Sequence, residues 1–166
     1  MNKAFKITLV ILGMWLGMTC LIDFVAVPSA FRNISSRQEA GTLGMIIFTT
    51  FNNVEVVFAL ILGVCIYFFQ KKVAWRKAYL AAVVGLFIIV PLHTFYMSPR
   101  IVELNQQKYK LTEGTEEYQV LENEHLFLHN TFRKTDGTKI LIILFMIIAM
   151  VKTRDESEEV LAKGNL

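Results

Sequence analysis

Three ionisable residues interrupt long apolar stretches of this sequence: Asp23, Glu55 and His93. A charged side chain in the hydrocarbon of a membrane is costly, so such residues usually face the interior of a helix bundle and pair with another polar group. A carboxyl group kept out of water holds or releases its proton according to the charges around it. We therefore predict a polar cluster that binds protons, a small cation or another small ligand.

A polar stripe precedes the last apolar run and could meet these three groups. Its members follow the three-to-four-residue spacing of one helix face: Glu122, His125, His129, Phe132, Arg133 and Asp136. We expect this stripe to face Asp23 and Glu55, with Arg133 or Lys139 neutralising a carboxylate. The predicted ligand or proton cluster is Asp23, Glu55, His93, Arg133 and Asp136. Supporting contacts are expected from Thr19, Asn52, Tyr96, Arg100 and Lys139.

A metal site is a second interpretation of the histidines. His125 and His129 are four residues apart, and Glu122 precedes His125 by three, so all three share one helix face. Four-helix di-iron proteins need two Glu-x-x-His motifs, and only Glu122–His125 is present here. A single metal or a haem held by His93 with His125 or His129 is the remaining option. Binding without any cofactor is the simpler expectation, and no catalytic residue is identified.

The composition places these residues in a membrane protein. The chain of 166 residues is 54% hydrophobic and only 19% charged, with a mean hydropathy of +0.47. A soluble domain usually has about a quarter of its residues charged. The apolar residues form four blocks, which excludes a soluble enzyme, a disordered chain and a disulfide-stapled secreted module. The net charge of +3 fits basic residues at membrane boundaries rather than nucleic-acid binding.

The blocks predict an all-α fold, because a helix of about 20 mainly apolar residues crosses a bilayer. We expect one transmembrane domain over 1–166, an integral membrane four-helix bundle with an additional outer-side helix before the fourth span. Its segments are spans at about 7–30, 43–69, 78–97 and 134–151, an outer loop and helix at 98–133, and a charged cytoplasmic tail at 152–166. Asp136-Gly137 predicts a turn or break before the fourth apolar run. Pro91 predicts a kink in the third span.

Basic residues predict the orientation. Four spans would place nine Lys and Arg residues on the side of the termini and eight on the other side. The short loop around Lys71 and Lys72 holds four basic residues and no acid, and short loops count most. We therefore expect both termini in the cytoplasm, in the cytoplasmic membrane of a bacterium. The first apolar stretch is too long for a signal peptide and is expected to be a retained span.

Short motifs near all four spans resemble a family of four-span membrane proteins without a settled function, the transmembrane-protein-205-like proteins. The matching positions are Trp15, Gly17, Phe24, Pro28, Phe31-Arg32, Ala40-Gly41, Phe48, Ser98-Pro99-Arg100 and Phe132-Arg133-x-x-Asp136-Gly137. Asp136 stands where the family pattern has histidine. Resistance to metal-containing drugs in some members implies export or membrane handling. The anthrone-oxygenase-like proteins are similar in layout and imply an enzymatic alternative.

Three functions remain open from the sequence. The first is a binding or transport-accessory role for the polar cluster, with protons, a cation or a small polar ligand exchanged from the outer side. The second is an accessory or structural subunit of a larger membrane complex or homo-oligomer. The third is a metal- or haem-dependent oxidoreductase. Beside these, buried acid–base pairs could simply hold four helices in register.

Overall fold

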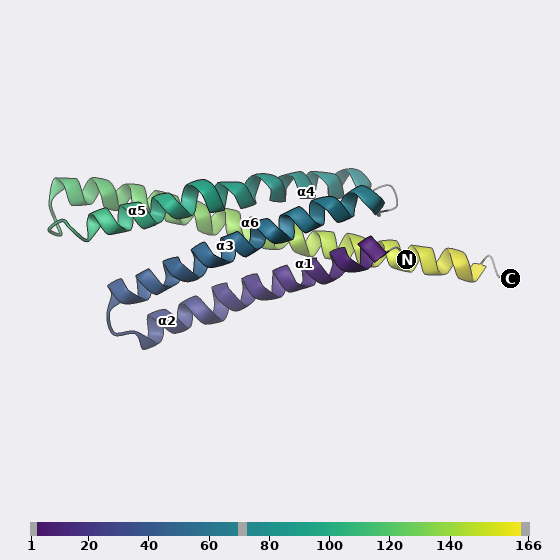
Figure 1. The fold of residues 1–166 in the computed structure, drawn as a ribbon, viewed down its shortest axis with the longest axis horizontal. Helices are drawn as coiled ribbons and strands as arrows, with labels where there is room; N and C mark the ends of the chain where they lie inside the picture. The colour runs from purple at the N-terminus through teal and green to yellow at the C-terminus, as the bar shows by residue number, and fades with distance from the viewer. Residues whose placement is uncertain (1–2, 70–72, 164–166) are drawn as a thin grey trace.

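The computed structural model describes residues 3–69 and 73–163, and within these ranges it contains helices and turns but no strand (Figure 1). The elements in chain order are α1 (Lys3–Leu21), the π-helical turn η1 (Ile22–Ala26), α2 (Val27–Asn33), α3 (Arg37–Phe69), α4 (Arg76–Pro91), the π-helical turn η3 (Leu92–Met97), α5 (Ser98–Lys108) and α6 (Glu116–Lys163). The segments α1–η1–α2 and α4–η3–α5 each form one continuous rod. The described chain therefore forms four long rods.

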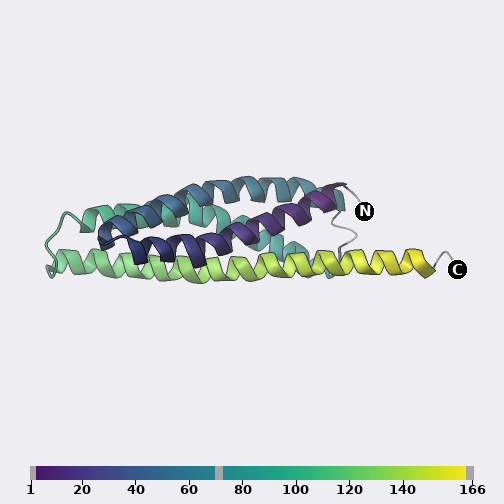
Figure 2. The same ribbon diagram turned by 90° about the horizontal axis from the view of Figure 1, so that it is seen from below.

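The rods pack side by side into an elongated bundle. α1 contacts α3 and α6, α4 contacts α3 and α6, and α5 contacts α6. Figure 2 shows α6 as a straight rod that runs along the whole bundle on one side of the other helices. At one end, α2 and the start of α3 diverge from α5 and the first part of α6 (Figure 1). This divergence leaves room between the rods at that end.

Two apolar cores hold the rods together. The larger core joins α1, α3, α4 and α6 around fully buried residues such as Leu12, Leu62 and Ile143. A smaller core joins η3, α5 and α6 at the divergent end around Met97, Leu104, Leu128 and Phe132. The ionisable residues of interest lie between these two cores.

Three rods are long and apolar enough to cross a membrane: Lys3–Asn33, Arg37–Phe68 and Arg76–Lys108. Their outward surfaces carry exposed apolar side chains such as Val10, Val64 and Ile88. Extended exposed apolar surface is typical of contact with lipid. The predicted all-α membrane helical bundle is therefore confirmed, whereas the membrane boundaries within each rod stay predictions.

The outer-side helix and the fourth span are not separate elements. α6 runs without interruption through the predicted outer helix, through Asp136-Gly137 and through the last apolar run. The predicted break at Asp136-Gly137 is therefore wrong. Gly137 has no positive φ, and a Cβ atom added there would meet nothing within 4 Å, so the glycine sits in ordinary helix.

The π-helical turns place two of the predicted residues, because Asp23 lies in η1 and His93 in η3. η1 comes shortly before Pro28, and η3 shortly before Pro99. A proline ring clashes with the carbonyl four residues earlier and lacks the N–H that would bond to it. A widened turn accommodates both effects, and such turns are frequent at functional sites. The expected distortion near Pro91 therefore lies after that residue and is explained by Pro99.

Candidate functional site

The centre of the bundle holds a buried ion pair. The Nζ atom of Lys139 lies 2.5 Å from Oε1 of Glu55 and 2.5 Å from Oδ1 of Asp136. The indole Nε1 of Trp15 donates a hydrogen bond of 2.7 Å to the same Glu55 oxygen. Glu55 and Trp15 are 0% exposed and Lys139 is 1% exposed. Lys139 is therefore the counter-ion of Glu55, one of the two alternatives that the sequence predicted.

Helix periodicity explains why these side chains meet. The neighbours of Glu55 on its own face of α3 are buried: Phe51, Asn52, Phe58 and Ala59. Along α6, buried residues at spacings of three and four lead from Asp136 and Lys139 to Ile143 and Met146. Residues spaced in this way share one helix face. The charged residues thus continue apolar stripes that already face the core.

Trp15 was missed as a site residue, since its deep position in the first span suggested only packing. An indole N–H in hydrocarbon needs an acceptor, and this requirement could have linked Trp15 to a buried carboxylate. The second oxygen of Glu55, Oε2, is buried without a hydrogen-bond partner among the described residues. The charge of Glu55 therefore depends on Trp15 and Lys139 alone.

The Trp15→Phe variant tests the contribution of the indole donor. Phenylalanine keeps an aromatic ring in the core and removes the N–H, so we expect a loss of about 1.5–3 kcal/mol in unfolding free energy, the usual contribution of a hydrogen bond to a charged group. The measurement is SDS-induced unfolding in mixed micelles. Trp75→Phe is the matched control, because Trp75 is half-exposed and stacks on Phe145. Equal effects of both substitutions would show that only packing is lost.

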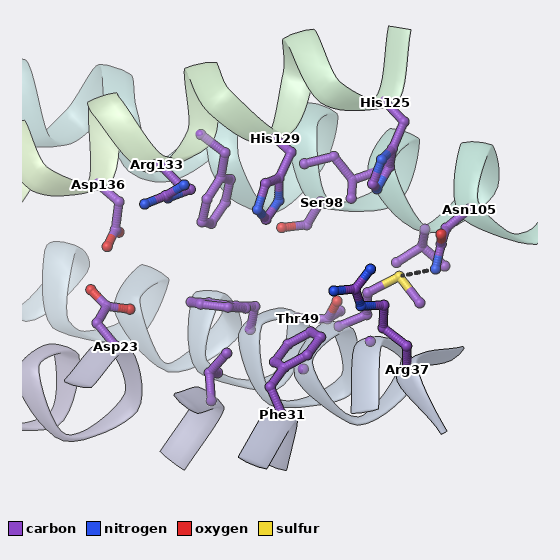
Figure 3. Close-up of a pocket in the computed structure, with 18 of the residues that line it drawn as sticks. Asp23, Phe31, Arg37, Thr49, Ser98, Asn105, His125, His129, Arg133 and Asp136 are labelled. Atoms are coloured by element: carbon purple, nitrogen blue, oxygen red, sulfur yellow. Dashed lines mark hydrogen bonds between the residues drawn. The ribbon is translucent and has the colours of Figure 1, made fainter. Parts of the chain in front are cut away.

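Asp136 links the ion pair to a pocket, and Asp23 lies opposite. The two carboxyl groups face each other across the floor of the pocket (Figure 3) and interact directly. Three carboxyl groups, those of Asp23, Glu55 and Asp136, are therefore gathered around the single ammonium group of Lys139. Arg133 lines the same pocket but forms no ion pair among the described residues. The structure thus brings four of the five predicted cluster residues to the floor or wall of one pocket or its ion pair.

The fifth residue, His93, lies beside the cluster without touching its carboxylates. Its Nε2 forms a 2.6 Å hydrogen bond with the Thr135 hydroxyl group, and its ring stacks on Phe132 with centroids 4.2 Å apart. The side chain is fully buried, and Nδ1 has no partner in the described part of the chain. His93 thus fixes η3 against α6 one turn from Asp136.

The pocket has a volume of about 570 Å³ and lies where the rods diverge. Its lining comes from η1 and α2, from the first part of α3, from α5 and from α6. Aromatic and aliphatic side chains such as Phe31, Phe48 and Phe132 form most of the wall. A volume of this size and an apolar lining with a few polar groups are typical of small-molecule sites.

His125 and His129 line the pocket away from its acidic floor (Figure 3) and stack on each other with ring centroids 5.9 Å apart. Burial lowers the pKa of His125, and the nearby positive charge of Lys108 lowers it further. Burial and then Arg133 lower the pKa of His129. Both imidazoles are therefore neutral at pH 7 when the pocket is empty.

The predicted metal set is not brought together. Glu122 pairs with Lys108, whereas His93 is bonded to Thr135. Among the described residues, no three His, Cys, Asp or Glu side chains form a group that could hold a metal ion. The geometry therefore gives no support to the metal or haem interpretation.

The predicted supporting residues, apart from Lys139, lie elsewhere. Thr19 donates to the Trp15 backbone carbonyl, and Asn52 donates to the Ser98 hydroxyl group. Tyr96 is 58% exposed. Arg100 pairs with Glu103 and Glu124, which fastens α5 to α6. These residues join helices and do not contact the buried carboxylates.

Comparison with known proteins gives one match. A family model described as "Domain of unknown function (DUF4149)" matches residues 10–110, more than half of the chain. No curated protein and no solved structure matches. The match agrees with an uncharacterised membrane family and does not support the resemblance to transmembrane-protein-205-like or anthrone-oxygenase-like proteins. It includes Asp23, Glu55 and His93, whereas Asp136 and Lys139 lie beyond its end.

Proposed function

The chain belongs to the DUF4149 family, and we propose that this protein reversibly takes up positive charge, as protons or a small cation, at Asp23 and Asp136. The site would serve a binding or transport-accessory role in the membrane. The observation that carries this proposal is the meeting of three carboxyl groups with one buried ammonium group, two of the carboxyls being on the floor of an open pocket.

The balance of charge supports uptake. Lys139 is shared by Glu55 and Asp136, so it offsets one of the three negative charges. Even with Arg133 counted as a second cation, one positive charge is missing. Like charges that face each other away from bulk water cannot both remain ionised without a proton or cation between them. Because Asp23 and Asp136 border the pocket, that charge can enter and leave.

The proposal includes α6 as the fourth span. α6 packs against α1 and α4, and its polar residues Asp136 and Lys139 face inward, whereas Leu141 and Ile148 are exposed on its other side. This is the arrangement that a span with charged residues needs in lipid. We retain the proposed orientation with both termini in the cytoplasm, because the basic short loop favours it. The pocket then opens in the outer half of the membrane.

Isotope-edited infrared spectroscopy can test the uptake, because the chain contains only three aspartates, Asp23, Asp136 and Asp155. Cell-free synthesis with ¹³C-aspartate would mark these three side chains. In a pH titration of the protein in nanodiscs, we expect a shifted carboxylic-acid band from the pocket pair at pH values where the exposed Asp155 is already ionised. Added monovalent cation should reduce that band if the cation replaces the proton.

Single variants assign the band. Asp23→Asn and Asp136→Asn should each remove it, because each leaves one carboxyl group without its like-charged neighbour, whereas Asp155→Asn should leave it unchanged. A folded protein whose labelled band is absent, or is indifferent to both pocket variants, would contradict the proposal. The ion pair would then serve only to hold the helices in register.

A further inference from the structure

The end of the pocket away from Asp23 and Asp136 is basic. Arg37, His125 and His129 line it, and the Arg37 guanidinium group extends toward the two imidazoles (Figure 3). Lys108 also lines this end but pairs with Glu122. One pocket therefore has carboxyl groups at its floor and cationic or neutral donors at its mouth.

The donors at the mouth lack partners. Arg37 has no ion pair among the residues that the structure describes. The Nδ1 atom of His125 is shielded from solvent and has no hydrogen-bond partner within the same residues. Buried polar groups are normally satisfied, so an unpartnered donor set inside a cavity indicates a missing acceptor. Arginine recognises phosphate and carboxylate groups through paired N–H donors.

The wall beside this mouth is apolar and continues onto the outside of the bundle. Phe24, Val27 and Phe31 of η1 and α2 line the pocket, and Phe24 is 70% exposed. On the opposite side α2 diverges from α5 (Figure 1). An apolar surface that runs from a cavity to the lipid-facing side can hold a hydrocarbon chain without an aqueous entrance.

We infer that the pocket binds an anionic membrane lipid, with its phosphate at Arg37, His125 and His129 and its hydrocarbon along Phe24, Val27 and Phe31. The acidic floor fixes this direction, because Asp23 and Asp136 repel a phosphate. From His125 to Asp136 the α6 axis rises by roughly 16 Å, long enough for part of an acyl chain below the head group. This inference uses the other end of the pocket and does not depend on charge uptake at Asp23 and Asp136.

A thermal-shift experiment on the full chain in neutral detergent can test it. Phosphatidylglycerol, phosphatidylcholine with the same acyl chains, and inorganic phosphate are added separately, and the apparent affinity is taken from the rise in Tm. We expect phosphatidylglycerol to bind at least tenfold more tightly than phosphatidylcholine. Inorganic phosphate should give no comparable shift, since it cannot use the apolar wall.

Two arginine variants separate a built site from general attraction. Arg37→Gln should weaken phosphatidylglycerol binding at least tenfold, the effect of removing a charged hydrogen-bond donor. Arg32→Gln removes the same charge from the neighbouring end of α2, outside the pocket lining, and should leave binding unchanged. Equal binding of the two lipids, equal losses in the two variants, or an equal shift by phosphate alone would each overturn the inference. The comparison of lipids needs no variant and remains decisive if Arg37→Gln fails to fold.

Discussion

Replacing Lys139 with methionine should cost about 3–5 kcal/mol of unfolding free energy, the usual result of removing one partner from a buried ion pair. Methionine fills much of the space of the lysine stem, so lost packing contributes little. The loss arises because Glu55 is fully buried and retains only the indole N–H of Trp15. The measurement is SDS-induced unfolding of the purified protein in mixed micelles.

The double variant Glu55→Gln with Lys139→Met is the control for this prediction. A buried ion pair replaced on both sides by neutral residues is often tolerated, because the cost of removing two charges from water disappears together with their attraction. A glutamine oxygen can still accept from Trp15. We therefore expect the double variant to recover to within about 1–2 kcal/mol of the unmodified protein. If the two substitutions simply added, Lys139 would not be the counter-ion of Glu55.

The position of Lys139 combines an architectural and a chemical role. Its contact with Glu55 lies in the dry core, whereas its contact with Asp136 reaches the edge of the pocket. A change of charge at Asp23 or Asp136 is therefore felt by the ion pair that joins α3 to α6. Through this lysine, an event in the pocket can alter how tightly the two longest helices are held together.

The sequence predicted the fold class well because lipid imposes a simple rule. Apolar blocks of span length must be helical, since no water is present to satisfy the backbone. The inward placement of Glu55 and His93 followed from the cost of exposing them to hydrocarbon. Such arguments need only the position of a residue along its own helix.

The partners of these residues were harder to predict, because they depend on the rotation of one helix against another. Arg133 and Lys139 were equivalent by charge, and only the packing of α6 puts Lys139 in the core and Arg133 at the pocket. Arg100 follows His93 by seven residues but pairs with Glu124 of α6. The widened turn η3 lies between these positions, and it shifts the face on which every later residue falls.

The continuity of α6 gives the second prediction with a large effect. Asp136-Gly137 resembled a turn, yet the structure continues the helix through both residues. Gly137→Pro should therefore cost about 3 kcal/mol or more, because proline removes a helical N–H and clashes with the carbonyl of residue 133. The other rods accommodate Pro28 and Pro99 by widened turns, but a widened turn here would rotate Lys139 away from its partners. The unfolding free energy in mixed micelles measures the effect.

Gly137→Ala should change stability in the opposite direction. Alanine is favoured over glycine in a helix by about 0.5–1 kcal/mol, and the added methyl group meets nothing within 4 Å. Gly114 is the matched control, since its φ of +91° lies in the left-handed region and Gly114→Ala should destabilise. If Gly137→Ala instead behaved like Gly114→Ala, residue 137 would sit in a turn. α6 would then not be the continuous rod that carries Asp136 and Lys139 to the same face.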